Sequence, residues 1–372
     1  MNGDKIMKVP FIDLNRINDK VQVEVNNTIK DIIHQKNFIS GERVKHFETQ
    51  FSAITRIPYV VACSSGTMAL YTCGRVLDLK EEDEVIFPVY TAIESIFPFV
   101  QLGIKPVFVD IDPVTYTMDT NKIKQAITEK TTAIVCVHLY GNTCNMNAIM
   151  NIAEENNLYV IEDCSQAHLA RYKGKDVGSF GHISAYSFNP TGNLGAYGEA
   201  GAVVTNNPEV YEKIKLFIDN GKVGKYEYNS LGLNLKMDEL QGAVLGVKIR
   251  YLQKWVTMRR NHARIYENNF LKFSEVSTPK VQFNSSHAYH LYPIQIKFRD
   301  EVRTHLQKNG IDTGKHYHIP LHLQKAFEYL GYKEGDFPVA ETLAKHIITL
   351  PMYPELRLDE INYIVEKIGE II

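Results

Sequence analysis

Three short segments of the chain combine residue types that could bind an anion or carry acid–base chemistry. The first reads Ala-Cys-Ser-Ser-Gly-Thr over residues 62–67 and falls between a predicted strand and a predicted helix. Free N–H groups and the positive end of the helix dipole meet at a helix start, so glycine beside small hydroxyl residues there could cradle a phosphate. Plain N-capping by serine or threonine would produce the same pattern.

The second segment, Val160–His168, is an apolar run that leads into two carboxylates, Glu162 and Asp163. A strand of this kind brings them to the carboxyl edge of a sheet, where open α/β folds bind their ligands. One carboxylate there could keep a ring nitrogen protonated. An acid that caps the next helix is an equally good interpretation of this segment alone.

The third segment, residues 185–201, is rich in glycine and lies between two apolar runs. This composition predicts a loop with unusual backbone angles. Such loops cradle ligands or simply make tight turns, and the segment alone does not decide between the two.

The elements that would position these segments form an alternating pattern over about residues 60–205. Nearly continuous apolar runs are typical of buried strands, and their alternation with helical stretches such as Thr67–Leu77 and Asn145–Asn156 predicts an α/β layer with a large, mostly parallel, seven-stranded sheet. The predicted strands are Tyr59–Cys63, Glu84–Phe87, Lys105–Val109, Ala133–His138, Tyr159–Glu162, Ile183–Phe188 and Gly201–Thr205.

After residue 206 the pattern changes to a long helical stretch over about residues 236–273. Beyond it, a strand-like run at His290–Phe298 and three further helical patterns predict a small α+β domain. These patterns lie at residues 300–308, 338–346 and 358–368. We therefore predict a large α/β domain over residues 1–245 and a small C-terminal domain over residues 246–372, with the boundary inside the long helix.

The composition argues against several kinds of partner. The chain has 372 residues, 41 of them basic and 43 acidic, so the formal net charge of −2 gives no reason to expect nucleic acid or an anionic membrane surface. No long apolar window and no signal-peptide pattern occurs, so we expect no membrane span and a cytoplasmic location. His316 and His318, with His322 nearby, could in principle hold a metal, but no metal site is assigned.

In this order and spacing, the segments resemble the DegT/DnrJ/EryC1/StrS family of sugar aminotransferases, and the resemblance runs almost end to end. The motifs that carry it are Val9–Leu14, Phe38–Gly41, Ser64–Thr67, Val137–Gly141, Glu162–His168, Tyr317–His322, Tyr332–Pro338 and Leu350–Pro354. The resemblance implies fold type I of the pyridoxal-phosphate-dependent transferases, which is aspartate aminotransferase-like. It also implies a homodimer whose active sites are shared at the subunit interface.

The resemblance further implies pyridoxal 5′-phosphate (PLP) as the cofactor. Asp163 looks like the carboxylate that pairs with the pyridine nitrogen and keeps the ring protonated, and Gln166 looks like the residue beside the phenolic oxygen. His316 and Tyr317 match positions that often contact the nucleotide-sugar. The implied phosphate contacts are Ser65, Gly66, Thr67 and Ser187, with Asn234 reaching in from the neighbouring subunit.

The sequence departs from the family at the position that carries the chemistry. The family motif Ser-Phe-x-x-x-Lys-Asn is Ser-Phe-Asn-Pro-Thr-Gly-Asn here, so Gly192 stands at the place of the catalytic lysine. That lysine bonds to the cofactor aldehyde and then moves a proton between two carbons, and glycine can do neither. In a second departure, Ala92 stands where the family usually stacks an aromatic residue on the cofactor ring, although Tyr90 could compensate.

Three functional hypotheses follow. The favoured one is a nucleotide-sugar aminotransferase-like protein, built to aminate a keto-deoxyhexose on dTDP or UDP with glutamate as amino donor, in which transamination is absent or severely impaired. The second is a variant that uses pyridoxamine phosphate (PMP) for different chemistry on a keto-sugar. The third is a non-catalytic sugar-nucleotide-binding subunit. Any PLP or PMP bound by this chain would be held non-covalently.

Overall fold

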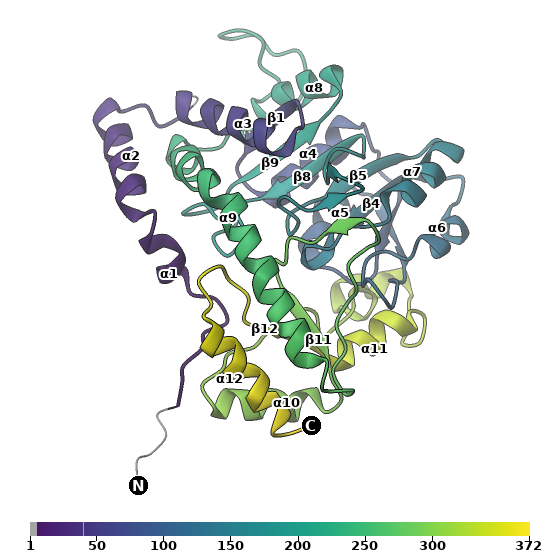
Figure 1. The fold of residues 1–372 in the computed structure, drawn as a ribbon. Helices are drawn as coiled ribbons and strands as arrows, with labels where there is room; N and C mark the ends of the chain where they lie inside the picture. The colour runs from purple at the N-terminus through teal and green to yellow at the C-terminus, as the bar shows by residue number, and fades with distance from the viewer. Residues whose placement is uncertain (1–5, 40) are drawn as a thin grey trace.

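The computed structural model describes residues 6–39 and 41–372 (Figure 1). Ser40, part of the motif at residues 38–41, and the first five residues lie outside the described residues. In the described part of the chain, three helices precede the first strand of the sheet, and five follow its last strand. They are α1 (Leu14–Asp19), α2 (Gln22–Gln35), α3 (Glu42–Thr55), α8 (Pro208–Ile218), α9 (Glu239–Phe270), α10 (Arg299–Lys308), α11 (Pro338–His346) and α12 (Leu358–Gly369).

A seven-stranded sheet forms the centre of the molecule, in the order β1-β9-β8-β5-β4-β2-β3. Its strands are β1 (Tyr59–Cys63), β2 (Glu84–Pro88), β3 (Lys105–Val109), β4 (Thr131–Val137), β5 (Tyr159–Asp163), β8 (Ile183–Ser187) and β9 (Gly201–Thr205). The strand pairs from β3 to β8 are parallel, whereas β9 pairs antiparallel with both β8 and β1. All seven strands predicted from the apolar runs are confirmed, each within two residues of its predicted ends.

Side chains of alternate residues on each strand enter cores on opposite faces of the sheet, as the two-residue period of a strand requires. On β2, Val85 and Phe87 pack in one core, whereas Ile86 packs in another with Met146 and Ile149. Helices α4 (Gly66–Val76), α5 (Phe97–Val100), α6 (Thr120–Ala126) and α7 (Met146–Glu155) connect the strands. Burial on both faces explains why these strands are continuous in apolar residues.

A second core lies under the C-terminal part of the chain, around the antiparallel pair β11 (Tyr292–Gln295) and β12 (Ile347–Leu350). Helices α10 and α12 and the second half of α9 cover it (Figure 1). Val9 and Ile17, from the start of the chain, also pack in this core. The proposed boundary between residues 245 and 246 falls inside α9, which runs unbroken from the neighbourhood of the sheet to this second core.

The small elements carry little sequence signal because they are very short. They are β6 (Arg171–Tyr172), β7 (Lys175–Asp176), β10 (Ser285–Ser286) and the 3-10 turns η1 (Ile93–Ser95), η2 (Leu139–Gly141), η3 (Leu321–Leu323) and η4 (Lys325–Leu330). Across the described residues, no helix has both the length and the apolar character needed to cross a bilayer.

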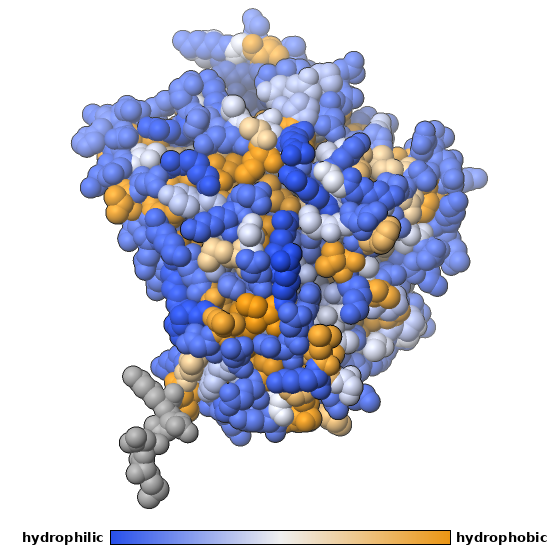
Figure 2. Space-filling model, in the orientation of Figure 1, coloured by the Kyte–Doolittle hydropathy of each residue, from blue (hydrophilic) through white to orange (hydrophobic). Residues whose placement is uncertain are grey.

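The face of the molecule shown in Figure 2 is mostly polar, with several small groups of apolar residues. Several of the most exposed apolar residues lie on the loop between α8 and α9, among them Tyr226, Tyr228 and Leu231, which is 86% exposed. This loop stands away from the body of the molecule beside α8 (Figure 1).

Candidate active site

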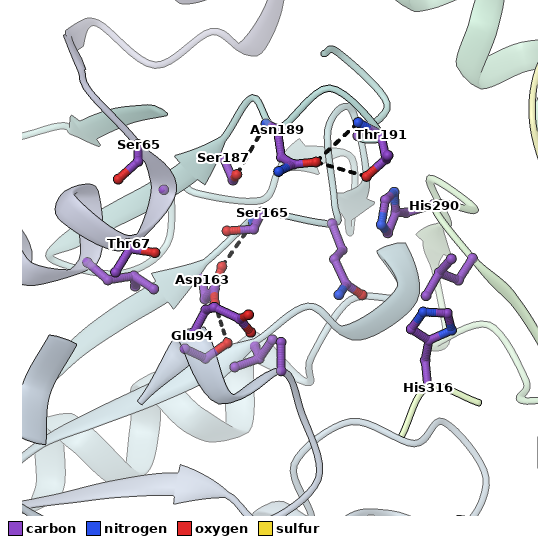
Figure 3. Close-up of a pocket in the computed structure, with 18 of the residues that line it drawn as sticks. Ser65, Thr67, Glu94, Asp163, Ser165, Ser187, Asn189, Thr191, His290 and His316 are labelled. Atoms are coloured by element: carbon purple, nitrogen blue, oxygen red, sulfur yellow. Dashed lines mark hydrogen bonds between the residues drawn. The ribbon is translucent and has the colours of Figure 1, made fainter. Parts of the chain in front are cut away.

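A cavity of about 730 Å³ opens where the parallel strands end. Its walls come from the segments that follow β1, β2, β4, β5 and β8, and from residues of the C-terminal half that lie against them. Figure 3 shows these side chains converging from separate elements. The position agrees with the general rule that open α/β sheets bind ligands beyond the carboxyl ends of their strands.

One wall of the cavity is the N-terminus of helix α4. Ser65 is its N-cap, and the Ser65 hydroxyl accepts a hydrogen bond from the N–H of Met68 at 3.2 Å. The N-capping interpretation of this segment is therefore confirmed. The first-turn N–H groups of an α-helix have no acceptor within the helix, and Gly66 and Thr67 line the cavity. The geometry leaves these N–H groups available to an anion.

Glycine at position 66 is required by the close approach of α4 to β8. A Cβ atom built on Gly66 would lie 2.5 Å from the Cβ of Ser187, a separation that two carbon atoms cannot adopt. The two segments that sequence analysis assigned to a phosphate, residues 65–67 and Ser187, therefore meet in one corner of the cavity. Any larger residue would push them apart.

Asp163 lies at the end of β5, in the floor of the cavity, and is 3% exposed. Its Oδ2 accepts a hydrogen bond from the Ser95 hydroxyl at 2.7 Å, and its Oδ1 accepts one from the N–H of Ser165 at 3.0 Å. These two bonds fix the carboxylate plane. Asp163 is thus a buried, oriented carboxylate whose negative charge faces the cavity (Figure 3).

Gln166 is held by two tyrosines. Its Oε1 accepts a hydrogen bond from the N–H of Tyr140 at 2.6 Å, and its Nε2 donates to the hydroxyl of Tyr317 at 3.3 Å. Burial raises the pKa of Tyr317, so this hydroxyl stays protonated. The structure therefore brings Gln166 and Tyr317 together in the cavity wall, although they are far apart in the sequence.

Tyr90 is not positioned to stack on a ligand in the cavity. It is 1% exposed and does not line the cavity, whereas Ala92 does. Its hydroxyl donates to the carbonyl of Tyr317 at 2.9 Å and accepts from the N–H of Tyr317 at 2.6 Å. Tyr90 therefore supports the backbone that carries Tyr317 instead of replacing an aromatic residue at position 92.

His316 lies at the opposite side of the cavity from α4 (Figure 3). Its ring stacks on Phe11 with the ring centres 5.5 Å apart, and its Nδ1 lies 2.7 Å from the hydroxyl of Thr349. Burial lowers the pKa of His316 below its usual 6.5. His316 therefore presents a neutral imidazole at the cavity wall.

Gly192 lines the cavity on the loop after β8, and its N–H donates to the carbonyl of Asn189 at 2.8 Å. Within the described residues, no lysine or arginine lines the cavity. The charged residues that do so are three carboxylates, Glu94, Asp163 and Glu199. The part of the chain that the structure describes therefore presents no amino group to a ligand in this cavity.

Asn234 lies outside this cavity. It is exposed on the segment between α8 and α9, where its backbone bridges to Asp219. The remaining predicted site residues, Ser65, Gly66, Thr67, Asp163, Gln166, Ser187, Gly192, His316 and Tyr317, all line the cavity. The structure of one chain brings together every predicted residue except the one expected from a neighbouring subunit.

Sequence analysis missed several polar residues of the cavity, among them Glu94 and His290. Glu94 lies on η1, a single turn too short to give a periodic pattern. His290 lies just before β11, in a run whose pattern predicts a strand. A histidine in such a run does not by itself indicate a ligand site. Only the tertiary fold shows that both face the cavity.

Outside the cavity, a buried polar cluster surrounds Glu162. Its carboxylate accepts hydrogen bonds from the N–H groups of Gly178, Phe180 and Gly181 at 2.7–2.8 Å and lies 2.9 Å from Nε2 of His138. The N–H of Cys144 donates to the other ring nitrogen of His138, so His138 carries its proton on Nε2 and donates to Glu162. Because these donors occupy both carboxylate oxygens, Glu162 serves to anchor the backbone between β7 and β8.

Glu162→Gln is expected to lower the free energy of unfolding by about 3 kcal/mol, because an amide NH₂ would face backbone donors in a buried site. Burial raises the pKa of Glu162, but hydrogen bonds from His138 and the backbone outweigh this, and the net pKa is lowered. The stabilisation is therefore present above pH 4.5 and lost as the pH falls through the lowered pKa.

Urea unfolding of both proteins at neutral and acidic pH measures this difference. Glu155→Gln is the matched control, because the ion pair of Glu155 with Lys124 is exposed and its loss should cost less than about 1 kcal/mol. Equal stability of the Glu162→Gln variant and the native protein would contradict the anchoring role.

Comparison of the sequence with known proteins identifies related aminotransferases. Residues 19–369 match the model of the DegT/DnrJ/EryC1/StrS aminotransferase family. A pleiotropic regulatory protein of Geobacillus stearothermophilus is 40% identical over 98% of both chains. A dTDP-3-amino-3,6-dideoxy-alpha-D-galactopyranose transaminase of Aneurinibacillus thermoaerophilus is 37% identical over 97% of this chain and 99% of its own.

Solved structures give the same result. DesV of Streptomyces venezuelae, crystallised in complex with a ketimine intermediate, superposes with a TM-score of 0.95 at 33% identity and 98% coverage of both chains. NtdA of Bacillus subtilis, crystallised with bound PMP, superposes with a TM-score of 0.90 at 31% identity, covering all of this chain and 86% of NtdA. The architecture is therefore that of the PLP-dependent aminotransferases of fold type I. The chain belongs to the DegT/DnrJ/EryC1/StrS aminotransferase family.

Proposed function

We propose that this chain binds PLP or PMP non-covalently, together with a keto-deoxyhexose carried on dTDP or UDP, and that ordinary glutamate-dependent transamination is absent or severely impaired. The observation that carries the proposal is that one cavity holds all the predicted cofactor residues except Asn234, together with glycine at position 192. The curated relatives include transaminases of dTDP- and UDP-linked sugars, and the cavity is large enough for a cofactor and the sugar of such a substrate.

The residues present fit a pyridoxal-type cofactor at both of its ends. The cradle at residues 65–67 and Ser187, which a Cβ on Gly66 would fill, suits a phosphate. Asp163, oriented by Ser95 and Ser165, suits a protonated ring nitrogen. Gln166 lines the same cavity and suits the phenolic oxygen. When bound, the cofactor would supply an electron-accepting ring for chemistry at carbon atoms next to an amine.

Residues 6–39 and 41–372 offer no covalent anchor and no lysine base for that chemistry. No lysine side chain reaches the cavity within the described residues, and general acid–base catalysis by such a group contributes about 10²–10⁴-fold to the rate. Ala92 also leaves one face of the cavity without an aromatic ring, which removes about 1 kcal/mol of stacking energy. Binding would survive these losses, whereas turnover would not.

We also propose that two copies pair through the loop between α8 and α9. Asn234, implied as a phosphate contact, lies outside the cavity of its own chain, which is consistent with its use in the site of a second copy. The same loop exposes Tyr226, Tyr228 and Leu231, an apolar group that would be buried in such a dimer.

If this loop forms the dimer interface, the dimer would bury the side chain of Leu231. Leu231→Asp is then expected to weaken the dimer by about 2 kcal/mol, roughly 30-fold in its dissociation constant, because that apolar contact is lost. Light scattering across a dilution series measures the change. Leu271→Asp is the matched control, since Leu271 is 84% exposed at the end of α9, away from this loop. A native protein that is monomeric at all concentrations would contradict the proposal.

Calorimetric titration tests the proposed ligands directly. PMP is expected to bind at one site per chain, and a dTDP- or UDP-linked keto-sugar is expected to bind to the PMP-loaded protein. With glutamate added, turnover of the keto-sugar should remain at least about 10²-fold below that of the Gly192→Lys variant. Absence of PMP and PLP binding would overturn the proposed function, as would native turnover equal to that of the variant.

A further inference from the structure

The imidazole of His290 contacts the residue next to the position of the missing lysine. Its Nδ1 lies 3.4 Å from Oδ1 of Asn193, the residue that directly follows Gly192. Its backbone N–H donates to the carbonyl of Tyr140 at 2.9 Å, and the N–H of Tyr140 donates to Gln166. His290 is therefore held between the Gly192 loop and Gln166, and it lines the same cavity as both (Figure 3).

The orientation of Asn193 determines which ring nitrogen of His290 carries the proton. The Asn193 NH₂ group donates to the carbonyl of Ala288 at 3.1 Å, so its Oδ1 is the atom that faces His290. An amide oxygen can only accept, so Nδ1 of His290 is the protonated nitrogen. The lone pair is then on Nε2, which has no protein hydrogen-bond partner within the described residues.

The surroundings also keep His290 neutral. Burial lowers the pKa of His290 well below 6.5, and the charge of Arg259 lowers it further, with smaller contributions from His168 and His316. Arg259 is fixed next to it by a hydrogen bond from its NH1 to the carbonyl of His290 at 3.2 Å. A neutral imidazole with a free Nε2 lone pair is a proton acceptor, not a donor, at neutral pH.

We propose that Nε2 of His290 is the base that accepts a proton from the aminomethyl carbon of PMP bound in this cavity, in place of the amine that Gly192 lacks. This inference rests on the proposed function, because it needs PMP in the cavity. In PMP the aminomethyl group is next to the phenolic oxygen, the atom assigned to Gln166, and His290 is linked to Gln166 through Tyr140. Asn193 is the positioning residue that keeps Nδ1 protonated.

The proton transfer balances without a further reagent. With PMP bound, Nε2 of His290 would take the proton as the C–H bond breaks and become an imidazolium, and the protonated ring would accept the electron pair. The reverse transfer returns a proton from Nε2 to the same carbon. In D₂O the imidazolium proton exchanges with solvent, so each cycle can replace the original hydrogen with deuterium. The rate of deuterium incorporation into PMP therefore measures how fast the base transfers this proton, and no keto-sugar is needed.

The tautomer can be tested in the protein without any ligand. Nitrogen NMR of histidine-labelled protein is expected to show His290 as a neutral imidazole at about pH 7, with its proton on Nδ1. Asn193→Asp should place a carboxylate on Nδ1 and raise the pKa of His290. A proton on Nε2 in the native protein, or no change in Asn193→Asp, would overturn the inference whether or not PMP binds.

The second experiment measures deuterium incorporation into PMP by proton NMR. His290→Asn and His290→Gln should lower the rate at least about tenfold while PMP affinity stays within about twofold. His305→Asn, which removes an imidazole on α10, is the control and should match the native rate. If PMP binds and native exchange is no faster than in free PMP, or is unchanged in the His290 variants, the inference fails. If PMP does not bind, the proposed function fails instead.

Discussion

Gly192→Lys is expected to convert this chain into an active glutamate-dependent aminotransferase, with a rate gain of about 10²–10⁴-fold on a keto-sugar substrate. The reason is that Asp163, Gln166 and the proposed phosphate cradle already line one cavity, so under the proposed function a single missing amine limits the chemistry. A Cβ at position 192 would meet only the Asn189 carbonyl at 3.1 Å and the Leu194 carbonyl at 3.9 Å. A Cβ at this position therefore fits after a shift of a few tenths of an ångström.

Gly192→Met is the matched control for this gain, because it adds a chain of similar length without an amine. The lysine variant should also acquire a visible absorbance band from covalently held PLP, which the methionine variant should lack. Recovery with methionine would show that bulk at position 192, and not an amine, was missing. No recovery with lysine in a protein that binds PLP would show that the site has lost more than the lysine.

Asp163→Asn is expected to weaken PMP and PLP binding by about 2 kcal/mol, roughly 30-fold, because a charge-assisted bond to the ring nitrogen is lost. The substitution keeps the shape of the side chain. It removes the charge and turns one oxygen that accepts from Ser95 or Ser165 into a donor. Fluorescence titration of the native and variant proteins measures the affinity ratio.

Glu94→Gln separates a specific pairing from a general effect of negative charge in the cavity. Glu94 also lines the cavity but is exposed, so its charge is screened and the affinity should change by less than about threefold. Equal losses in the Glu94 and Asp163 variants would contradict the role of Asp163. Unfolding measurements on each variant confirm that a loss of affinity is not a loss of structure.

Much of the fold could be predicted from the sequence because burial imposes a pattern on it. The seven strands of the sheet are covered on both faces, so they are continuous in apolar residues and stand out from their surroundings. The two-residue strand β6 and the turn η1 have no such pattern. The pairing of Val9 with Ile311 shows the other limit, since the start of the chain joins the C-terminal core without a local signal.

Some residues of the site could likewise be placed from the sequence, whereas others could not. Residues 65–67 and Asp163 follow buried strands directly, so their place at the sheet edge could be inferred from the strand ends. His290 and Glu94 come from segments with no chemical motif, and only packing brings them to the cavity. For Tyr90 the sequence suggested a role that the structure does not support. Tyr90 was a candidate for stacking on the cofactor ring, but its hydroxyl hydrogen-bonds to the backbone of Tyr317.

The most direct test of the central claim is the mass of the PLP-loaded protein after borohydride reduction, which makes any bond between the cofactor and a lysine permanent. Equilibrium dialysis before reduction establishes that PLP is bound. We predict that the reduced protein retains the mass of the unmodified chain, because no lysine among the described residues lines the cavity. A stoichiometric PLP adduct on one lysine of the native protein would contradict the account.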